Sequence, residues 1–395
     1  MKILTVNYEY PPVGGGGGVA HEQIAEELAK RHRVAVVTSA SKDLPRHEVR
    51  RGVEIFRVPV LGRGSWSVAS LPSMLTFPPL AWRAVHRLLR SEGFDVINSH
   101  FVVPTGVGSL PPALLTKTPH VLSVHGGDLY DPSKALSPHR LPVVRSVVSQ
   151  VMQRSDLVVA QSRNTRDNAH RYYAYDGPIE IVPLGMRRPE FDPVSRSDLG
   201  LGRDRFIAIT VGRLIRRKGI DRLLESLALP ECDDVDLVVV GDGPEGEGLR
   251  EQAAALGLGH RVIFTGHVPE ERKWQLLSVA DAYVSATLHE GFGLVYLEAM
   301  SVGLPVVTFD HGGQVDFLTD DVNGYLVPSG DVGALALALV RLASNPDTTS
   351  RMSTTNLRQA PEHSVERCAL DYERLFDQLL TGPSVATSSK RAAAS

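Results

Sequence analysis

The chain has 395 residues, of which 43% are hydrophobic and 22% charged, and its formal net charge at pH 7 is −3. This length exceeds what one compact core needs and suits two domains with a cleft between them. The balanced charge provides no field that would steer the protein to nucleic acid, so we expect no nucleic-acid partner and infer partners from local sites.

The expected location follows from the cysteines and from the apolar runs. Cys232 and Cys368 have neither CxxC nor metal-ligand spacing, which favours a reducing compartment over a disulfide framework. The N-terminal MKILTVNYEY is not typical of a signal peptide, and no apolar run approaches the roughly 20 residues of a membrane span. We therefore expect a cytoplasmic protein, with peripheral contact at the inner face of a membrane as the alternative.

Short apolar runs alternate with helical stretches in the first half of the chain. One helix is expected from Ala20 to Arg31, and the runs between helices are KILTVN, RVAVVT, DVINSH, HVLSVH, DLVVAQ and IEIVP. Continuous apolar strands separated by amphipathic helices indicate a parallel sheet covered on both faces. The residues from 1 to 185 are thus predicted to form a Rossmann-like domain.

The same pattern restarts after an irregular stretch near Pro183 to Asp204. Its strands are FIAITVG, DLVVVG, RVIFTG, AYVSA and LPVVTF, with helices near 220–228, 245–256, 270–278 and 290–302. We predict an α/β protein with two doubly wound parallel-sheet domains, which bind ligands where the carboxyl ends of their sheets face each other. The residues 381–395, rich in Ser, Ala and Thr, are predicted to be a disordered tail.

Five consecutive glycines, Gly14 to Gly18, follow the first predicted strand in NYEYPPVGGGGGVA. Such a run indicates a loop that a ligand approaches closely or a loop that needs positive φ. Gly15-x-Gly17-x-x-Ala20 also matches a dinucleotide fingerprint, but seven residues separate the run from the strand, and the second strand ends without an acidic residue. We favour a loop approached by a sugar phosphate, with a simple turn as the alternative.

Two cations follow the first strand of the second domain. Arg213 comes directly after that strand and Lys218 precedes the next helix, so both are expected at the carboxyl end of the sheet. Two cations held there would suit a diphosphate. The alternative is a solvated basic loop, because Arg and Lys are common on protein surfaces.

The segment HEGFGLVYLEAM has glycines at the start of a predicted helix, whose unpaired N–H groups and dipole favour an anion. Glu290 and Glu298 would lie about 12 Å apart along that helix. The carboxyl pair of a glycosidase lies about 5 to 9.5 Å apart, so these two glutamates better suit opposite ends of a nucleotide sugar. The alternatives are a favourable first-turn charge for Glu290 and an exposed helical glutamate for Glu298.

Several further segments follow predicted strands or flank them. His125 and the weaker candidate His100 end strands, where side chains point into a cleft, although a lone histidine is more often structural. The loop Asp310 to Gly313 either presents N–H groups to a ligand or forms a simple turn. The stretch Leu71 to Leu89, together with Arg140, Arg145 and Arg154, forms either a face for a membrane or lipid-linked acceptor or ordinary core helices.

Six motifs together resemble the retaining glycosyltransferases of family 4, also described as glycosyl transferases group 1, which have the GT-B fold. The resemblance spans nearly the whole chain and depends on Gly14 to Gly18, His125-Gly126-Gly127-Asp128, Gly212-Arg213 with Lys218, Gly241-Asp242-Gly243-Pro244, Glu290-x7-Glu298 and Asn323-Gly324-Tyr325-Leu326-Val327. It implies a donor domain at 186–362 and a C-terminal helix, about 363–380, that joins the acceptor domain 1–185. The chain departs from the commonest pattern in having five glycines where two or three are usual.

The resemblance also implies residue roles. Arg213 and Lys218 would bind the donor diphosphate, Glu290 the donor sugar and Glu298 the ribose, and His125 would contact the sugar near its 6-position. Further donor contacts are expected from Gly16, Gly17, Gly212, Gly291, Phe292, Gly293, Leu294 and Val295. The acceptor side is expected to include Gly15, His100 and Asp128.

The expected activity is transfer of a hexose-type sugar from a nucleoside-diphosphate sugar to a hydroxyl, with anomeric retention and without a cofactor or metal. Asp234-Val235-Asp236 precedes its strand and is at the wrong end of the sheet for a metal-diphosphate site. UDP is expected as the nucleotide ahead of GDP or ADP, and the acceptor is a sugar, a lipid-linked molecule or a small molecule. The alternatives are a glucan synthase, a nucleotide-sugar epimerase and a non-catalytic sugar-nucleotide-binding protein.

Overall fold

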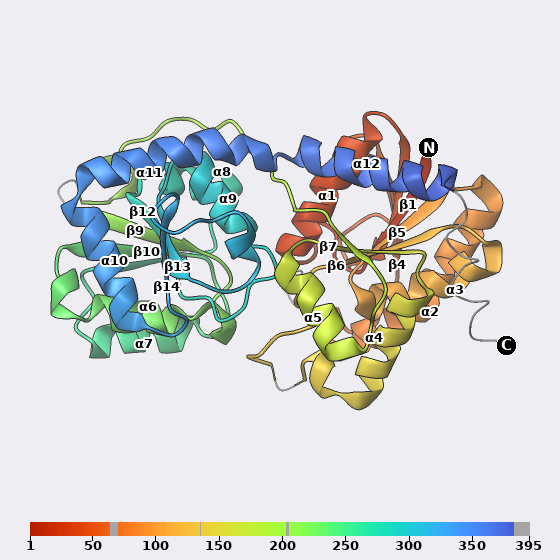
Figure 1. Ribbon diagram of the computed structural model, residues 1–395, viewed down its shortest axis with the longest axis horizontal. Coiled ribbons are helices and arrows are strands. Elements are labelled where there is room, and N and C mark those ends of the chain that lie inside the picture. Colours follow the sequence, from red (N-terminus) through yellow and green to blue (C-terminus); the bar gives the residue numbers. More distant parts are fainter. Residues whose placement is uncertain (64–69, 135, 203–204, 383–395) are drawn as a thin grey trace. The chain divides into compact units, whose positions relative to one another are not determined.

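The computed structural model describes residues 1–63, 70–134, 136–202 and 205–382, and the chain divides into two compact units (Figure 1). The first unit comprises residues 1–186 and the C-terminal segment from 364, and the second comprises 187–363. The sequence places these boundaries one residue earlier, at 185/186 and 362/363. The predicted tail lies outside the described residues from 383 onward.

The first unit contains an eight-stranded sheet in the order β3-β4-β2-β1-β5-β6-β7-β8. Only β3 and β4 pair antiparallel. The apolar runs predict six of the strands and miss β3 and β4, in which exposed or half-exposed residues alternate along the strand. The strands are β1 (Lys2–Asn7), β2 (Arg33–Ser39), β3 (His47–Arg50), β4 (Val53–Val58), β5 (Val96–His100), β6 (His120–Val124), β7 (Leu157–Ala160) and β8 (Ile179–Ile181).

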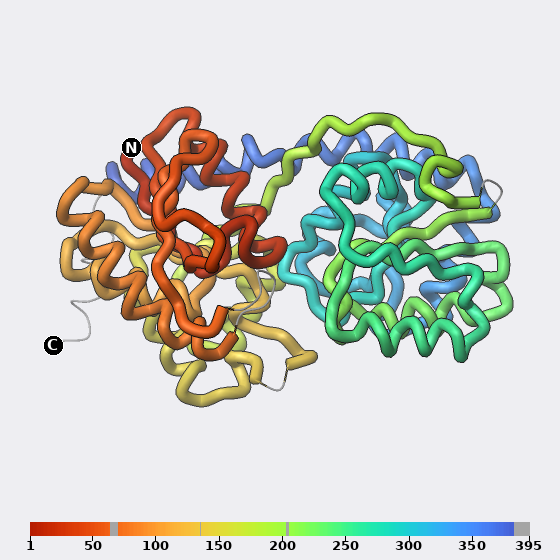
Figure 2. The backbone as a smooth tube through the Cα atoms, turned by 180° about the vertical axis from the view of Figure 1, so that it is seen from behind, coloured from red at the N-terminus to blue at the C-terminus, as the bar shows by residue number. Residues whose placement is uncertain are grey.

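Helices cover both faces of this sheet. One core cluster packs Phe77, Ala81 and Val85 against the sheet, and the other is built around β6 and β7. The C-terminal helix packs on the first helix, so the end of the chain returns to the first unit, as the colours of Figure 2 show. The helices are α1 (Gly16–Ala29), α2 (Leu71–Glu92), α3 (Val107–Thr116), α4 (Pro142–Arg154), α5 (Arg163–Tyr173) and α12 (Val365–Thr381).

The second unit contains a six-stranded, fully parallel sheet in the order β11-β10-β9-β12-β13-β14. Numbered within the unit, this is the 3-2-1-4-5-6 order of a Rossmann sheet. The strands are β9 (Phe206–Val211), β10 (Val235–Val240), β11 (Val262–Gly266), β12 (Ala282–Ser285), β13 (Val306–Phe309) and β14 (Gly324–Val327). The helices are α6 (Ile220–Leu227), α7 (Gly246–Ala255), α8 (Glu270–Val279), α9 (Leu294–Ser301), α10 (Val332–Ser344) and α11 (Pro346–Gln359).

Short helical turns complete the connections between these elements. They lie at Val102–Gly106, Pro138–Arg140, Ser197–Leu199, Arg216–Lys218, Pro230–Cys232, Gly313–Asp316 and Ala360–His363. The predicted α/β class with two Rossmann-like parallel-sheet units is confirmed.

The strand order of each sheet reverses at one point, and ligands of open α/β sheets bind outside the carboxyl ends of the strands there. In the first unit the reversal lies between β1 and β5, and in the second it lies between β9 and β12. The segments that leave these four strands carry the glycine run, His100, the Arg213–Lys218 segment and the loop containing Glu290. The topology therefore selects the same segments as the sequence motifs.

Candidate functional site

The chain that leaves β9 brings the two predicted cations into one place. Gly212 follows the strand, and a Cβ added to it would lie 3.4 Å from Cε of Lys218. The side chain of Lys218 therefore passes directly beside the residue that precedes Arg213. Arg213 and Lys218 are both partly exposed at the carboxyl end of the sheet, so the geometry that the sequence predicts for them is present.

Glu290 is held in this cationic cluster. Its Oε2 lies 2.6 Å from Lys218 Nζ, and its Oε1 lies 3.9 Å from a guanidinium nitrogen of Arg217. Burial acts to raise the pKa of Glu290, but the charges of Lys218 and Arg217 outweigh it and lower the pKa to about 2. Glu290 is therefore ionised at neutral pH, and Arg217 is a neighbour that the predicted set does not include.

The helix that follows Glu290 begins later than predicted. α9 starts at Leu294, because Gly293 has φ 97° and a Cβ there would lie 2.4 Å from the ring of Tyr296. The prediction of a helix from Glu290 is wrong, and the separation of about 12 Å that assumed it does not apply. Gly291, Phe292 and Gly293 form the approach to the helix, and no side chain of the described residues caps its first turn.

The loop after β13 packs on the loop after β12. The N–H of Gly313 donates to the carbonyl of Glu290 at 2.8 Å, and a Cβ on Gly313 would lie 2.0 Å from the carbonyl oxygen of Gly291. This N–H, expected to face the donor, is used within the protein. The Asp310–Gly313 loop thus supports the backbone of the Glu290 segment.

Glu298, in the second turn of α9, pairs with a residue that sequence reasoning missed. Nζ of Lys273, on α8, lies 2.8 Å from Oε1 of Glu298. Burial raises the pKa of Glu298, and the charge of Lys273 opposes that rise. The two residues are 25 positions apart on different helices, so no spacing rule connects them.

In the first unit, His100 at the end of β5 meets His125, which follows the neighbouring strand β6. Their ring nitrogens lie 2.9 Å apart, and the other ring nitrogen of His125 lies 2.9 Å from Oε1 of Gln161. His21 of α1 packs against His100 with ring centroids 4.1 Å apart. Sequence reasoning missed His21, which lies within the first helix, and Gln161, which ends the predicted run DLVVAQ but has an amide side chain that was not taken as a site residue.

Burial determines the charge of this histidine cluster. It lowers the pKa of His125 to about 4 and that of His21 to about 3, and it lowers the pKa of His100 well below its ordinary value. All three rings are therefore neutral at pH 7. Since His125 donates from Nδ1 to Gln161, its Nε2 accepts from Nδ1 of His100.

Asp128 links two loops of the first unit. Its carboxylate accepts the N–H of His125 at 2.9 Å and the N–H of Val102 at 3.0 Å. Burial raises the pKa of Asp128 to about 6, although these backbone hydrogen bonds act to lower it. Both oxygens thus serve the loops, and the acceptor-side role expected for Asp128 stays a prediction.

The glycine run consists of positions with different environments. α1 begins at Gly16, so the helix expected from Ala20 starts four residues earlier and the last three glycines are not in a loop. A Cβ on Gly17 would lie 2.5 Å from Cζ of Phe101, whereas a Cβ on Gly15 or Gly16 would meet nothing within 4 Å. Packing within the chain explains Gly17 but leaves Gly15 and Gly16 unexplained.

The stretch from Leu71 to Leu89 lies within α2, which has an apolar and basic outer surface. Leu71 is 69% exposed and Leu75 67% exposed. A groove of about 430 Å³ beside the helix is lined by Pro59, Val60, Leu61, Leu75, Thr76, Pro79, Leu80 and Arg83. None of the helices in the described ranges is long and apolar enough to span a bilayer.

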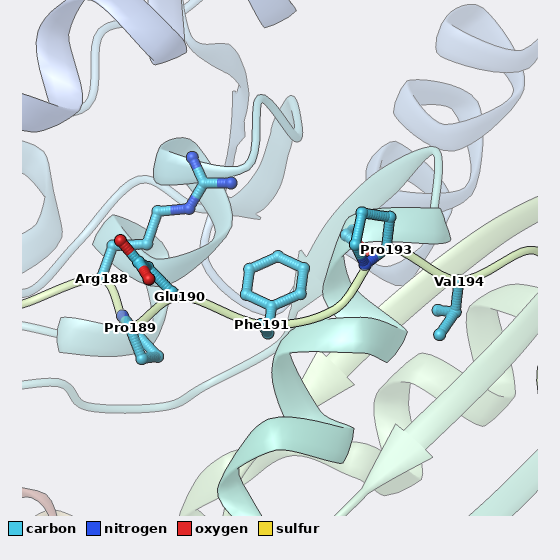
Figure 3. Close-up of a pocket in the computed structure, with 7 residues that line it drawn as sticks. Arg188, Pro189, Glu190, Phe191, Pro193 and Val194 are labelled. Carbon is cyan, nitrogen blue, oxygen red and sulfur yellow. The ribbon is translucent and has the colours of Figure 1, made fainter.

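A second pocket, of about 570 Å³, lies in the second unit (Figure 3). It is lined by Ser278 of α8 and by six residues of the segment that enters the unit, namely Arg188, Pro189, Glu190, Phe191, Pro193 and Val194. The ring of Phe191 stacks on Trp274 with centroids 6.2 Å apart. None of the predicted site residues lines this pocket.

The described residues contain no group of three or more His, Cys, Asp or Glu side chains arranged to hold a metal ion. Asp236 lies near the amino end of β10 and pairs with Arg205 at 2.7 Å. The two free cysteines, Cys232 and Cys368, are buried.

Two family descriptions match the chain in sequence. "Glycosyltransferase Family 4" matches residues 14–187, and "Glycosyl transferases group 1" matches residues 192–359. The chain is 30% identical over 387 residues to a D-inositol 3-phosphate glycosyltransferase of Streptomyces avermitilis, covering 91% of this chain and 82% of that protein. It is 28% identical over 368 residues to a GDP-mannose-dependent alpha-(1-6)-phosphatidylinositol monomannoside mannosyltransferase of Mycolicibacterium smegmatis, covering 89% and 91%.

Solved structures share the fold. Sucrose-phosphate synthase from Thermosynechococcus elongatus matches with a TM-score of 0.83 and 24% identity, over 97% of this chain and 100% of that one. Anabaena Alr3699/HepE, in complex with UDP and glucose, matches with a TM-score of 0.76 and 22% identity, over 96% and 100%. The architecture is that of a GT-B protein. The chain belongs to the family 4, group 1 glycosyltransferases, which confirms the resemblance inferred from its motifs.

Proposed function

We propose that this glycosyltransferase moves a hexose-type sugar from a nucleoside-diphosphate sugar to a hydroxyl acceptor, with retention and without a metal. The observation that carries the proposal is the cluster between β9 and β12. Lys218 pairs there with ionised Glu290, and Arg213 lies two residues after the end of β9, next to Gly212, which the Lys218 side chain contacts.

Cleavage of the anomeric C–O bond places negative charge on the leaving diphosphate and positive charge on the sugar. Cations and helix N–H groups that are already aimed at the diphosphate stabilise that transition state. In this proposal Arg213, Lys218 and the N–H groups of Leu294 and Val295 receive the diphosphate. Glu290 accepts hydrogen bonds from hydroxyls of the sugar, and Glu298 accepts hydrogen bonds from hydroxyls of the ribose.

Retention is proposed to occur by substitution on one face of the sugar. The acceptor oxygen forms the new bond to the anomeric carbon, and its proton passes to the departing phosphate oxygen. Glu290 is a poor nucleophile because Lys218 and Arg217 hold its charge and keep its pKa at about 2. A covalent sugar adduct on any carboxylate, trapped with a slow donor, would contradict this step.

UDP is the proposed nucleotide, with GDP as the main competitor. UDP is bound in the Anabaena structure, whereas the Mycolicibacterium relative is named for GDP-mannose. The names of two relatives also suggest two kinds of acceptor. The Streptomyces relative is named for D-inositol 3-phosphate, and the Mycolicibacterium relative is named for phosphatidylinositol monomannoside. The exposed leucines of α2 favour an acceptor with an apolar part.

The test combines binding with product analysis. Thermal unfolding is measured with UDP-, GDP- and ADP-sugars in EDTA, because a donor at 100 times its Kd stabilises the fold by about 2.7 kcal/mol. The stabilising donor is then incubated with D-inositol 3-phosphate or with water alone as acceptor, and proton NMR identifies the first anomer formed. We expect a product that keeps the donor's configuration. An inverted anomer, a need for metal or an epimerised sugar nucleotide would contradict the proposal.

A further inference from the structure

Lys273 lies between two carboxylates at the edge of the proposed donor site. Its Nζ is 2.8 Å from Oε1 of Glu298 and 2.6 Å from Oε1 of Glu270. The side chains of Lys273 and Glu298 are only 14% and 17% exposed, whereas that of Glu270 is 67% exposed. The buried contact is therefore the one between Lys273 and Glu298.

The two carboxylates differ in how their oxygens are satisfied. Oε1 of Glu270 also accepts the indole N–H of Trp274 at 3.0 Å, and the group is open to solvent. Oε2 of Glu298 is buried and has no hydrogen-bond partner in the part of the chain that the structure describes. Leaving a buried carboxylate oxygen without a donor is costly, so a donor from a bound molecule is the natural completion of this site.

The helices that carry this pair are held by the segment that enters the second unit. The guanidinium of Arg188 lies over Phe191 and donates to the carbonyl of Ser301, the last residue of α9. Phe191, which Figure 3 shows on the same segment as Arg188, in turn stacks on Trp274 of α8, next to Lys273 in sequence. One short segment thus contacts both helices, and it restrains the distance between Lys273 and Glu298.

We propose that Lys273 is a positioning residue of the donor site. It orients Glu298 through Oε1 so that Oε2 accepts a hydroxyl hydrogen bond from the ribose of the bound nucleotide. This inference rests on the proposed function, since it assumes that a nucleoside diphosphate occupies the site between β9 and β12.

The charge of Lys273 has a second consequence for Glu298. Burial raises the pKa of Glu298, and Lys273 opposes the rise, so removal of Lys273 leaves only the raising effect. The carboxylate would then take up a proton at higher pH and lose acceptor capacity. Nucleotide binding in a variant without Lys273 should weaken as the pH falls, starting at a higher pH than in the wild type.

The first experiment compares UDP with 2′,3′-dideoxyuridine diphosphate by calorimetry, and uses the GDP pair if GDP binds more tightly. Lys273→Met should raise the Kd of UDP on the order of tenfold, and Lys273→Arg should recover part of the loss. The Kd of the dideoxy nucleotide should not change in either variant, because this nucleotide lacks the hydroxyls that would donate hydrogen bonds to Glu298. Glu270→Gln is the matched control, which removes the exposed carboxylate. The Kd values of this variant for UDP and for the dideoxy nucleotide should stay near those of the wild type.

The second experiment measures the Kd of UDP from pH 8 to pH 5.5 in the wild type and in Lys273→Met, with thermal unfolding to verify the fold. A larger loss of affinity at low pH in the variant supports the proposal. Equal weakening of UDP and its dideoxy analogue, or unchanged affinity for UDP, overturns the role of Lys273 while the proposed function stands. If no nucleoside diphosphate binds the wild type, the proposed function itself fails, and the inference with it.

Discussion

The two units place clusters of different electrical character at the carboxyl ends of their parallel strands. At the carboxyl ends of β5, β6 and β7, three buried histidines and Gln161 form a neutral cluster, in which His100, His125 and Gln161 are linked by hydrogen bonds and the His21 ring packs on His100. Between β9 and β12, the cluster consists of charged groups in direct ion pairs, Lys218 with Glu290. Two Rossmann-like sheets therefore carry clusters with different electrostatic properties.

The difference comes from what each sequence provides beside the buried group. The histidines have amide and imidazole neighbours, so burial is the main cause that lowers their pKa values, and they stay neutral at pH 7. Glu290 has two cations within 4 Å, and their charges lower its pKa more than burial raises it, so the carboxylate stays ionised. A neutral network suits hydroxyl groups of a sugar, and a charged one suits an anionic leaving group.

The largest effect is expected from breaking the charged cluster. Arg213→Ala should lower kcat by about 100-fold or more, because under the proposed function it removes a cation that stabilises the leaving diphosphate while the fold remains. Arg216→Ala, an exposed arginine of the same segment, is the matched control and should stay close to wild-type activity. Steady-state kinetics and thermal unfolding of both variants make the comparison, and near-normal turnover of Arg213→Ala would exclude its leaving-group role.

The pH dependence of stability should separate the two units. His21 and His125 have pKa values of about 3 and about 4 in the folded unit, below the ordinary value, so the unfolded chain binds protons first as the pH falls. The first unit should lose up to about 1.4 kcal/mol per histidine for each pH unit between about 6.5 and 4. The stabilisation from Glu290, whose pKa is lowered to about 2, is fully present above pH 4.5 and is lost only below it.

Hydrogen exchange measures this difference directly. Peptides that cover β5 and β6 should lose protection between pH 7 and pH 5, after correction for intrinsic exchange, and peptides that cover β9 and β12 should not. His260→Asn, which removes an exposed histidine of the second unit, is the control and should change neither set. Equal loss of protection in both units would show that the buried histidines do not set the acid sensitivity of the first unit.

A smaller effect on stability should distinguish glycines that the packing of the chain requires from glycines that it does not require. Gly17→Ala should cost about 1–3 kcal/mol, because the new Cβ would lie 2.5 Å from the ring of Phe101, and Phe101→Leu in the same chain should recover part of that loss. Gly16→Ala has open space and should leave stability unchanged or raised by up to about 1 kcal/mol. Chemical denaturation measures both.

The turnover of Gly16→Ala then shows whether the glycine at this position is needed for ligand binding or only for folding. Under the proposed function, Gly16→Ala lowers turnover without lowering stability, since its Cβ would project toward the phosphate or the acceptor. If turnover of Gly16→Ala equals that of the wild type, the glycine run is a matter of folding only.

Local patterns were sufficient to predict most of the architecture. Continuous apolar runs such as β1 and β10 lie buried in parallel sheets, and their order along the chain gives the two Rossmann-like units. The edge strand β3 and its neighbour β4 were missed because half-exposed residues interrupt their apolar pattern. Two helix starts were also predicted at the wrong residue because of glycines. α1 begins at Gly16 despite the low helix propensity of glycine, and α9 begins only after Gly293, which has a positive φ.

The site was predictable only in part, for a physical reason. Arg213, Lys218 and Glu290 follow strands, and parallel strands bring their carboxyl ends together. Lys273 and His21 reach the predicted residues through tertiary packing of helices, which leaves no signal in local spacing. Gln161 ends the predicted run DLVVAQ, but its amide gave no reason to select it before its contact with His125 was known. The ion pair between Lys218 and Glu290 likewise joins residues 72 positions apart.

The central claim is that the charged cluster between β9 and β12 binds the diphosphate of the donor. A crystal structure of the full chain with UDP tests it most directly. We predict the β-phosphate within hydrogen-bond distance of Lys218 Nζ and the Arg213 guanidinium, at the first turn of α9. Density for the diphosphate at any other position, with Arg213 and Lys218 uninvolved, would contradict the account.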